Sequence, residues 1–290
     1  MLQEIAAARQ ILVVSGSAEV DGHAFCTGLE FLTGLPGSRI YLQGPTCSVV
    51  SLMKGAVFRP RHTRDLLETS SLNICPLGNL IDMAHTHEAS RRHDKVYALL
   101  GMASDDFSTA GISPDYSLPW EELLKRLVKF LLGAHVSVQT WPNKEMVLID
   151  AKACVLGKIT SVEGIQGNKQ IVGVISQILM GRQMVKAYEA SVVLSVSAKV
   201  VKVGDIICLL KGASKPTIIR PCKDHFAIIM IATSPEGPTE DKSVEFSGII
   251  QSATSFRHDL LLVWDWEHSA PGSIDLDQYE TVVEKNELHA

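Results

Sequence analysis

The sequence lacks the short motifs that would assign it to a common class of enzyme. It contains no G-x-G-x-x-G or G-x-x-x-x-G-K-[ST] phosphate loop and no G-x-S-x-G nucleophile elbow, so nucleotide binding and serine-hydrolase chemistry have no support. Its six cysteines include no C-x-x-C pair, the spacing typical of zinc and dithiol redox sites. We therefore expect no cofactor and no bound metal.

It also lacks a basic excess and long hydrophobic runs. The 290 residues include 27 Lys and Arg against 32 Asp and Glu, and a net charge of -5 gives no electrostatic basis for nucleic-acid binding. The longest apolar stretches fall far short of the ~20 residues that cross a bilayer, and Glu4 stands where a signal peptide carries positive charge. We expect a cytoplasmic globular protein with no nucleic-acid partner and no membrane span.

Apolar spacing predicts helices in the first half of the chain. The strongest helix is Trp120–Leu132, which follows Pro119, carries Glu121 and Glu122 at its start, and ends before Gly133. A short strand is predicted over 11–14. Further helices are predicted over 2–10, 20–32, 48–58, 77–87 and 94–101.

After Gly133 the pattern changes to short apolar runs separated by glycines and prolines, which predicts strands. Ile171–Met180 fits a helix or a strand, Pro235–Lys242 a polar loop, and Asp275–Asn286 a closing amphipathic helix. We predict an α+β fold with a mainly helical region over 1–135 and an antiparallel, barrel-like β region over 136–290, as two domains or as one integrated domain. The predicted strands cover 147–149, 153–162, 190–200, 205–210, 217–220, 226–232 and 260–266.

Three stretches, in this order along the chain, resemble fungal heterokaryon-incompatibility (HET) proteins. The first is Arg91–Met102 (RRHDKVYALLGM) with Ile112–Ser117 (ISPDYS), the second is Val203–Pro221, and the third is Leu260–Glu267 (LLLVWDWE). In that family these stretches belong to the region that accompanies the HET domain, and the family does not define a biochemical role for this region.

The chain also departs from the family pattern. Met1–Ala6 resembles the end of the HET domain, so we expect a chain that lacks the domain itself and the cell-death activity attributed to it. The LPSWVPDW stretch of the family is missing too, with Gln139–Pro142 near its place. We expect a stand-alone, HET-derived protein, and a truncated gene model would begin in the same way.

The first motif supplies candidate site residues at a predicted helix start. A carboxylate there can act as an acid–base group or cap the helix. We predict that Asp94 is catalytic and that Tyr97 and Tyr116 bind substrate. In the alternative, structural interpretation Asp94 caps the helix, and Tyr97 packs with its hydroxyl hydrogen-bonded.

Arg220–His225 lies between two apolar strands, where a turn at the mouth of a barrel could hold polar groups over a pocket. An imidazole titrates near neutrality, so we predict His225 as a general acid–base residue and Arg220 as a substrate-binding residue. Asp224 can pair with His225 only if the chain turns there, because neighbours on a strand face opposite ways. The alternative is an ordinary turn.

Two further groups complete the candidates. Trp264 and Trp266 share one face of a predicted strand, so they either line a substrate pocket or pack in the core. His85 and His87 form an H-x-H pair, but on a helix their imidazoles point about 200° apart, which is a poor zinc geometry. We predict Trp264 and Trp266 as substrate-binding and assign no metal ligands.

These observations lead to two hypotheses about function. In the first, the protein binds a small apolar metabolite of fungal secondary metabolism, and an enzymatic role would be a cofactor-independent cyclisation or isomerisation that works by shape, water exclusion and one or two acid–base groups. In the second, it is a non-enzymatic interaction or regulatory module in heterokaryon-incompatibility signalling, with a protein partner. Both are compatible with a homo-oligomer.

Overall fold

The computed structural model of the chain describes residues 2–8, 10–34, 45–57, 71–85, 87–107, 110–142, 144–166, 169–180, 183–195, 197–233 and 255–266, together with 235, 248, 250 and 253. The closing helix predicted over Asp275–Asn286 lies outside the described residues, as does nearly all of the loop predicted over Pro235–Lys242.

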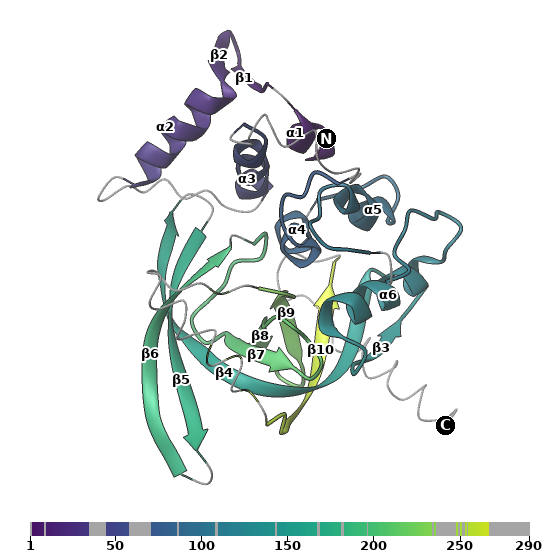
Figure 1. Cartoon of the computed structure of the whole chain (residues 1–290), viewed down its shortest axis with the longest axis vertical. Helices are drawn as coiled ribbons and strands as arrows, with labels where there is room; N and C mark the ends of the chain where they lie inside the picture. Colours follow the sequence, from purple (N-terminus) through teal and green to yellow (C-terminus); the bar gives the residue numbers. More distant parts are fainter. Residues whose placement is uncertain are drawn as a thin grey trace.

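The helices α1 to α6 all precede the main sheet, and the short hairpin β1–β2 lies among them (Figure 1). α6 matches its prediction because its signals are local: Glu121 and Glu122 lie in its first turn, and Gly133 ends it at a φ of 86°. The elements are α1 (Leu2–Ala7), β1 (Leu12–Ser15), β2 (Ala18–Asp21), α2 (Gly22–Gly34), α3 (Pro45–Val57), α4 (Leu77–Ala84), α5 (Asp94–Leu100) and α6 (Trp120–Leu132).

The main sheet has eight strands and makes the chain an α+β protein. Its order is β10-β9-β8-β7-β4-β5-β6, and β3 pairs with β4. In Figure 1 the β5–β6 hairpin projects at the end of the molecule opposite β1 and β2. The strands are β3 (Ser137–Thr140), β4 (Met146–Gln166), β5 (Lys169–Met180), β6 (Gln183–Ser195), β7 (Ile206–Leu210), β8 (Thr217–Pro221), β9 (Phe226–Met230) and β10 (His258–Asp265).

β10 occupies a special place because it pairs on both sides. It runs antiparallel to β4 over its whole length and parallel to β9, with Leu262 opposite Phe226. The expectation of a purely antiparallel sheet is wrong at this pair, because a long connection after β9 brings β10 back in the same direction. The sheet is therefore mixed and mostly antiparallel.

β4 corrects a second prediction. It is one strand of 21 residues, where the sequence predicts two short ones separated at 150–152. Gly157 does not break it, but stands at a register shift against β7. A Cβ on Gly157 would lie 2.5 Å from the Cγ1 of Val174, so the glycine allows β5 to approach closely.

One hydrophobic cluster joins helices and sheet. It contains Leu80 and Ile81 of α4, Leu123 of α6, and Ile149 and Leu262 of the sheet, so its members come from both sides of residue 135. A second cluster packs β5 and β6 against the other faces of β7, β8 and β9. In the described part of the chain no helix is long and apolar enough to cross a membrane.

Candidate functional site

Seven ring side chains from separate segments form one continuous set of contacts, which we call the aromatic cluster. Ring centroids lie 5.4 Å apart for Tyr97 and Tyr116, 5.8 Å for His93 and Trp120, and 6.1 Å for Trp120 and Trp266. The cluster thus leads from the surface into the core. Its members are Tyr116, Tyr97, His93, Trp120, Trp266, Trp264 and His85.

Local periodicity explains how these rings meet. His93 and Tyr97 are four residues apart at the start of α5, which places them on one face of the helix. Trp264 lies in β10 and Trp266 directly follows its last residue; two positions apart on an extended chain, both indoles point to one side, with centroids 4.8 Å apart. Trp120 begins α6 and reaches both groups. Four of the five predicted substrate-binding residues therefore lie in this cluster.

The outer end of the cluster is polar and half-buried. The hydroxyl of Tyr116, which is 49% exposed, donates to Oδ1 of Asp94 at 2.5 Å, and this bond raises the pKa of Tyr116. The hydroxyl of Tyr97 donates to the carbonyl of Asp115 at 2.9 Å. Tyr97 is thus buried with its hydroxyl bonded, as the structural alternative required. Asp94, in contrast, does not cap α5, because no side chain bonds the start of that helix.

A buried group of charged side chains lies at the inner end, where α4 finishes. The carboxylate of Asp82 accepts two bonds from the Ile231 amide, at 3.0 and 3.1 Å. The carbonyl of Asp82 accepts from the Ala198 amide, which places Lys199 beside the end of α4. Nζ of Lys199 donates to the carbonyls of Ile228 and Asp265, at 3.3 and 3.0 Å.

Burial dominates the titration of this group. It raises the pKa of Asp82 to about 7, although the bonds from the Ile231 amide and the charge of Lys199 act in the opposite direction. It lowers the pKa of Lys199 to about 8, partly offset by Asp265 and Asp82. Burial, followed by the charges of Lys199 and Lys95, holds the pKa of His85 well below its usual value, so His85 is neutral.

Three ring nitrogens of the aromatic cluster are buried without a hydrogen-bond partner in the described part of the chain: Nε2 of His85, Nε1 of Trp120 and Nε1 of Trp266. Their side chains are only 4–5% exposed, and the three rings are in contact. A buried polar atom without a partner costs about 1–3 kcal/mol. The cluster therefore holds hydrogen-bonding nitrogens that no group in the described part of the chain satisfies.

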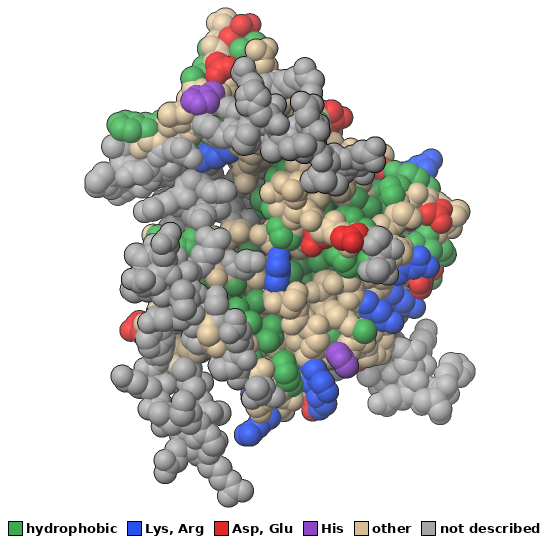
Figure 2. All heavy atoms as spheres, in the orientation of Figure 1, with side chains coloured by type: hydrophobic (Ala, Val, Ile, Leu, Met, Phe, Trp, Pro, Cys, Tyr) green, Lys and Arg blue, Asp and Glu red, His purple; other side chains and the backbone are tan. Residues whose placement is uncertain are grey.

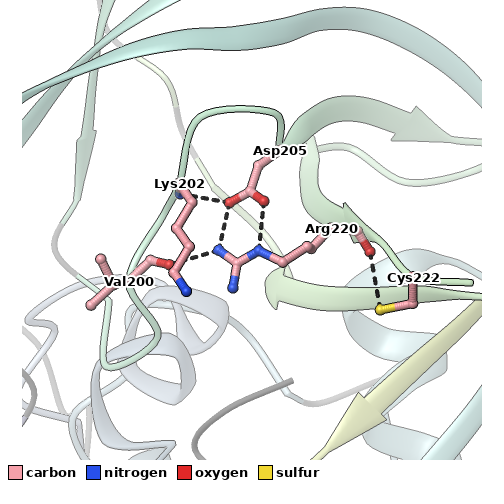
Figure 3. Close-up of polar contacts among 5 residues, drawn as sticks. All are labelled: Val200, Lys202, Asp205, Arg220 and Cys222. Atoms are coloured by element: carbon pink, nitrogen blue, oxygen red, sulfur yellow. Dashed lines mark hydrogen bonds and ion pairs between the residues drawn. The ribbon is translucent and has the colours of Figure 1, made fainter. Parts of the chain in front are cut away.

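Arg220 lies elsewhere, in an ion pair (Figure 3). Its Nε and Nη2 donate to the two carboxylate oxygens of Asp205, both at 2.8 Å, and Nη2 also donates to the Val200 carbonyl at 2.8 Å. Asp205 is 1% exposed and also accepts from the Lys202 amide. The arginine thus fastens the segment before β7 to β8, which supplies a structural role for the residue predicted to bind substrate.

His225 lies in the turn between β8 and β9. The Cys222 amide donates to its carbonyl at 2.9 Å, which closes the turn. That turn brings Nδ1 of His225 to 2.7 Å from Oδ1 of Asp224, and the bond lowers the pKa of Asp224. The pairing of these neighbours thus occurs as the turn geometry allows. The hydrogen bonds of His225 and Asp94 belong to different parts of the fold.

The two histidines of the H-x-H pair do not meet at a metal centre. α4 ends at Ala84, and His85 turns into the core while His87 lies beyond the helix. Within the described residues, no three His, Cys, Asp or Glu side chains come together in a group that could hold a metal ion.

Sequence reasoning missed the charged side chains around the cluster. Asp82 lies within the helix predicted over 77–87, and Lys199 lies in the apolar run predicted as a strand over 190–200. A lone cation inside such a run was the available signal. Glu145 was missed as well: it accepts from Lys95 and lies 3.1 Å from Nε of Arg92, which ties α5 to the start of β4.

No family model, no curated protein and no solved structure matches this chain. The resemblance to HET proteins therefore stays a prediction from the quoted stretches, and the function has to be argued from the geometry.

Proposed function

We propose that the protein binds a small apolar metabolite at the aromatic cluster and carries out a cofactor-independent isomerisation or cyclisation there. Predicted substrate-binding rings from three separate segments support this proposal, because Tyr97, Tyr116, Trp264 and Trp266 all belong to one connected set. The set leads from an exposed tyrosine to the interior.

The observation that carries the proposal is the trio of unpartnered ring nitrogens on His85, Trp120 and Trp266. An indole N–H donates and cannot accept, so the two tryptophans call for an acceptor. Lys199 donates from Nζ to the carbonyl of Asp265, which lies between Trp264 and Trp266 in the sequence, and its positive charge acts on His85 of the cluster. A suitable ligand is therefore an apolar ring system that bears a carbonyl, hydroxyl or carboxylate oxygen.

The catalytic part of the proposal rests on Asp94. Its carboxylate lies at the outer end of the cluster and is held by the Tyr116 hydroxyl. In an isomerisation it would accept a proton from one carbon of the substrate and return it to another, so no electrons are gained or lost. His225 remains a predicted acid–base residue that bonds Asp224 in another part of the fold.

Binding is tested with 2-naphthol, which joins an apolar two-ring body to one oxygen, and with naphthalene, which lacks the oxygen. We expect 2-naphthol to quench tryptophan fluorescence saturably and to bind more tightly than naphthalene. Trp266→Phe should weaken 2-naphthol by about 3–10-fold, because one hydrogen bond contributes about 0.5–1.5 kcal/mol. Trp141→Phe, outside the cluster, is the matched control. Equal affinities in the wild type and Trp266→Phe would overturn the proposal.

Catalysis is tested with 3-cyclohexen-1-one, whose conjugated isomer absorbs strongly in the ultraviolet. We expect Asp94→Asn to abolish the conversion and Asp259→Asn, a change on an exposed strand residue, to leave it intact. The conversion rate of His225→Gln shows whether the second predicted acid–base residue contributes. No conversion by the wild type would contradict the isomerase part of the proposal and leave the binding part standing.

The same proposal includes the origin and setting of the protein. We propose that it derives from the HET family and works in the cytosol. The location is supported by free cysteines such as Cys26, Cys75 and Cys154, because thiols stay unpaired in a reducing compartment. We also infer that β4, β7, β8, β9 and β10 close into a small barrel behind a helical first half, because β10 pairs with both β9 and β4. In this arrangement the aromatic cluster lies where the helices meet β10.

One observation favours the second candidate function, an interaction or regulatory module in incompatibility signalling. Among the described residues, five of the nine large hydrophobic side chains that are exposed fall within 12–32, in β1, β2 and α2. Apolar side chains gathered on a surface are typical of protein-binding sites. Capture of a HET-domain protein by the wild type, lost in Phe31→Lys and kept in Val203→Lys, would support this candidate.

A further inference from the structure

The β1–β2 hairpin stands apart from the main sheet, and within the described residues each of its two strands has an open edge. It forms a two-stranded sheet of its own, and within the described ranges no other strand pairs with it. Figure 1 shows it at the end of the molecule above α2. Two-stranded sheets are marginally stable alone, and an open edge is a template for another strand.

The register gives the hairpin one face of mixed character. Leu12 lies opposite Asp21 and Val14 opposite Glu19, and residues directly opposite share a face. Leu12 and Val14 are each 58% exposed. This face is therefore apolar along β1 and acidic along β2. Figure 2 shows acidic and hydrophobic side chains at this projecting end of the molecule.

The backbone of β1 is also turned the right way for pairing. The Gly22 amide donates to the Ile11 carbonyl at 2.7 Å, at the open end of the hairpin. In an antiparallel ladder, residues alternate between bonding their partner strand and pointing away from it. The N–H and C=O groups of Leu12 and Val14 are therefore directed to the open edge, while those of Val13 are directed to β2.

We propose that β1 pairs antiparallel with β1 of a second copy of this chain, centred on Val13. Leu12 then lies opposite the partner subunit's Val14, and the outward groups of both residues form backbone hydrogen bonds across the two-fold axis. Leucine and valine side chains from both copies form a continuous apolar patch on one face. The result is a four-stranded sheet in the order β2-β1-β1-β2.

The charges on the two strands favour pairing through β1 and disfavour pairing through β2. β1 has the sequence Leu-Val-Val-Ser, so its pairing with itself brings no like charges together. β2 carries Glu19 and Asp21, and pairing of two copies through β2 would place acidic side chains opposite each other. The outer edges of the four-stranded sheet are thus protected, and the assembly stops at a dimer.

The oligomeric state tests the proposal. We expect sedimentation equilibrium of the full chain to show a reversible dimer, and Val14→Pro, which removes an outward N–H, to shift the protein to monomer. Val14→Lys should do the same, and Val203→Lys, at an exposed valine elsewhere, should leave the dimer intact. A wild-type monomer up to about 1 mM, equivalent to about 4 kcal/mol, or a dimer unaffected by both Val14 variants, overturns the proposal.

Hydrogen exchange gives a second readout that needs no variant. The amides of Leu12 and Val14 should become protected as the protein concentration rises, while the amide of Val13 stays equally protected throughout. Concentration-independent exchange at Leu12 and Val14 would contradict the pairing. The dimer does not involve the aromatic cluster, so its failure leaves the proposed function standing, and the reverse holds too.

Discussion

Lys199 offers the sharpest test of the buried charged group at the end of α4. Burial lowers the pKa of Lys199 from its usual 10.5 to about 8 in the folded state. Between these two pH values the unfolded chain holds a proton on this lysine and the folded chain does not. Because the unfolded state binds more protons there, stability rises with pH across this window.

The size of the effect follows from the two pKa values of Lys199. The gap between about 8 and 10.5, at about 1.4 kcal/mol for each pKa unit, is about 3 kcal/mol. Lys199→Met removes this titration. It also removes a cation from the neighbourhood of Asp82, which raises the pKa of Asp82 in the variant and acts in the same direction. As the pH rises from about 8 to 10.5, the free energy of unfolding of the wild type should therefore increase by about 3 kcal/mol relative to that of the variant.

Urea unfolding followed by circular dichroism, from about pH 7 to about pH 11, measures this difference. Lys152→Met is the control, because Lys152 forms an exposed pair with Asp259 at 2.7 Å and should give a curve parallel to the wild type. The other tyrosines, lysines and cysteines titrate alike in all three proteins. Parallel curves for the wild type and Lys199→Met would show that Lys199 keeps its ordinary pKa and would refute the buried placement.

Three further predictions follow from single contacts. Gly78→Ala should lower the unfolding free energy by about 1–3 kcal/mol in thermal melts, because its Cβ would lie 2.7 Å from Cβ of Ala232; adding Ala232→Gly should restore part of the loss, and no rescue would contradict this packing. Arg220→Met should cost about 3–5 kcal/mol in urea unfolding by leaving Asp205 buried without its cation, and a loss below about 1 kcal/mol would contradict the buried ion pair. In the wild type, the folded Asp82 carboxyl, with its pKa raised from 3.8 to about 7, binds a proton that the unfolded one has lost between about pH 4 and about pH 7. Stability should therefore fall by about 4 kcal/mol across this range, and Asp82→Asn should remove the fall. An unchanged dependence of the unfolding free energy on pH would contradict this.

Some elements of this fold can be predicted because their signals are local. α6 has the predicted bounds Trp120–Leu132, since its preceding proline, acidic first turn, apolar stripe and closing glycine all lie within the segment. The same holds for Trp264 and Trp266, whose rings meet because the two residues are two positions apart at the end of β10. Gly157 shows the opposite case. Whether it ends β4 or admits a neighbour depends on Val174, which lies on another strand.

The candidate site was only partly predictable for the same reason. Tyr97 and Tyr116 could be chosen from a shared motif, but their connection to Trp266 runs through Trp120, which sequence reasoning assigned only to a helix. Asp82 and Lys199 lie 117 positions apart, and only tertiary packing brings the two together at the end of α4. Arg220 was selected by its place in a turn, whereas its partner Asp205 decides its role.

The central claim is that the unpartnered nitrogens of the aromatic cluster receive a ligand. The chain has four tryptophans, so a 1H–15N correlation spectrum resolves four indole N–H signals. We expect 2-naphthol to move the signals of Trp120 and Trp266 saturably while that of Trp141 stays in place, because only the first two indoles are unpartnered donors of the cluster. Saturating 2-naphthol that leaves the Trp120 and Trp266 signals unmoved would contradict the account.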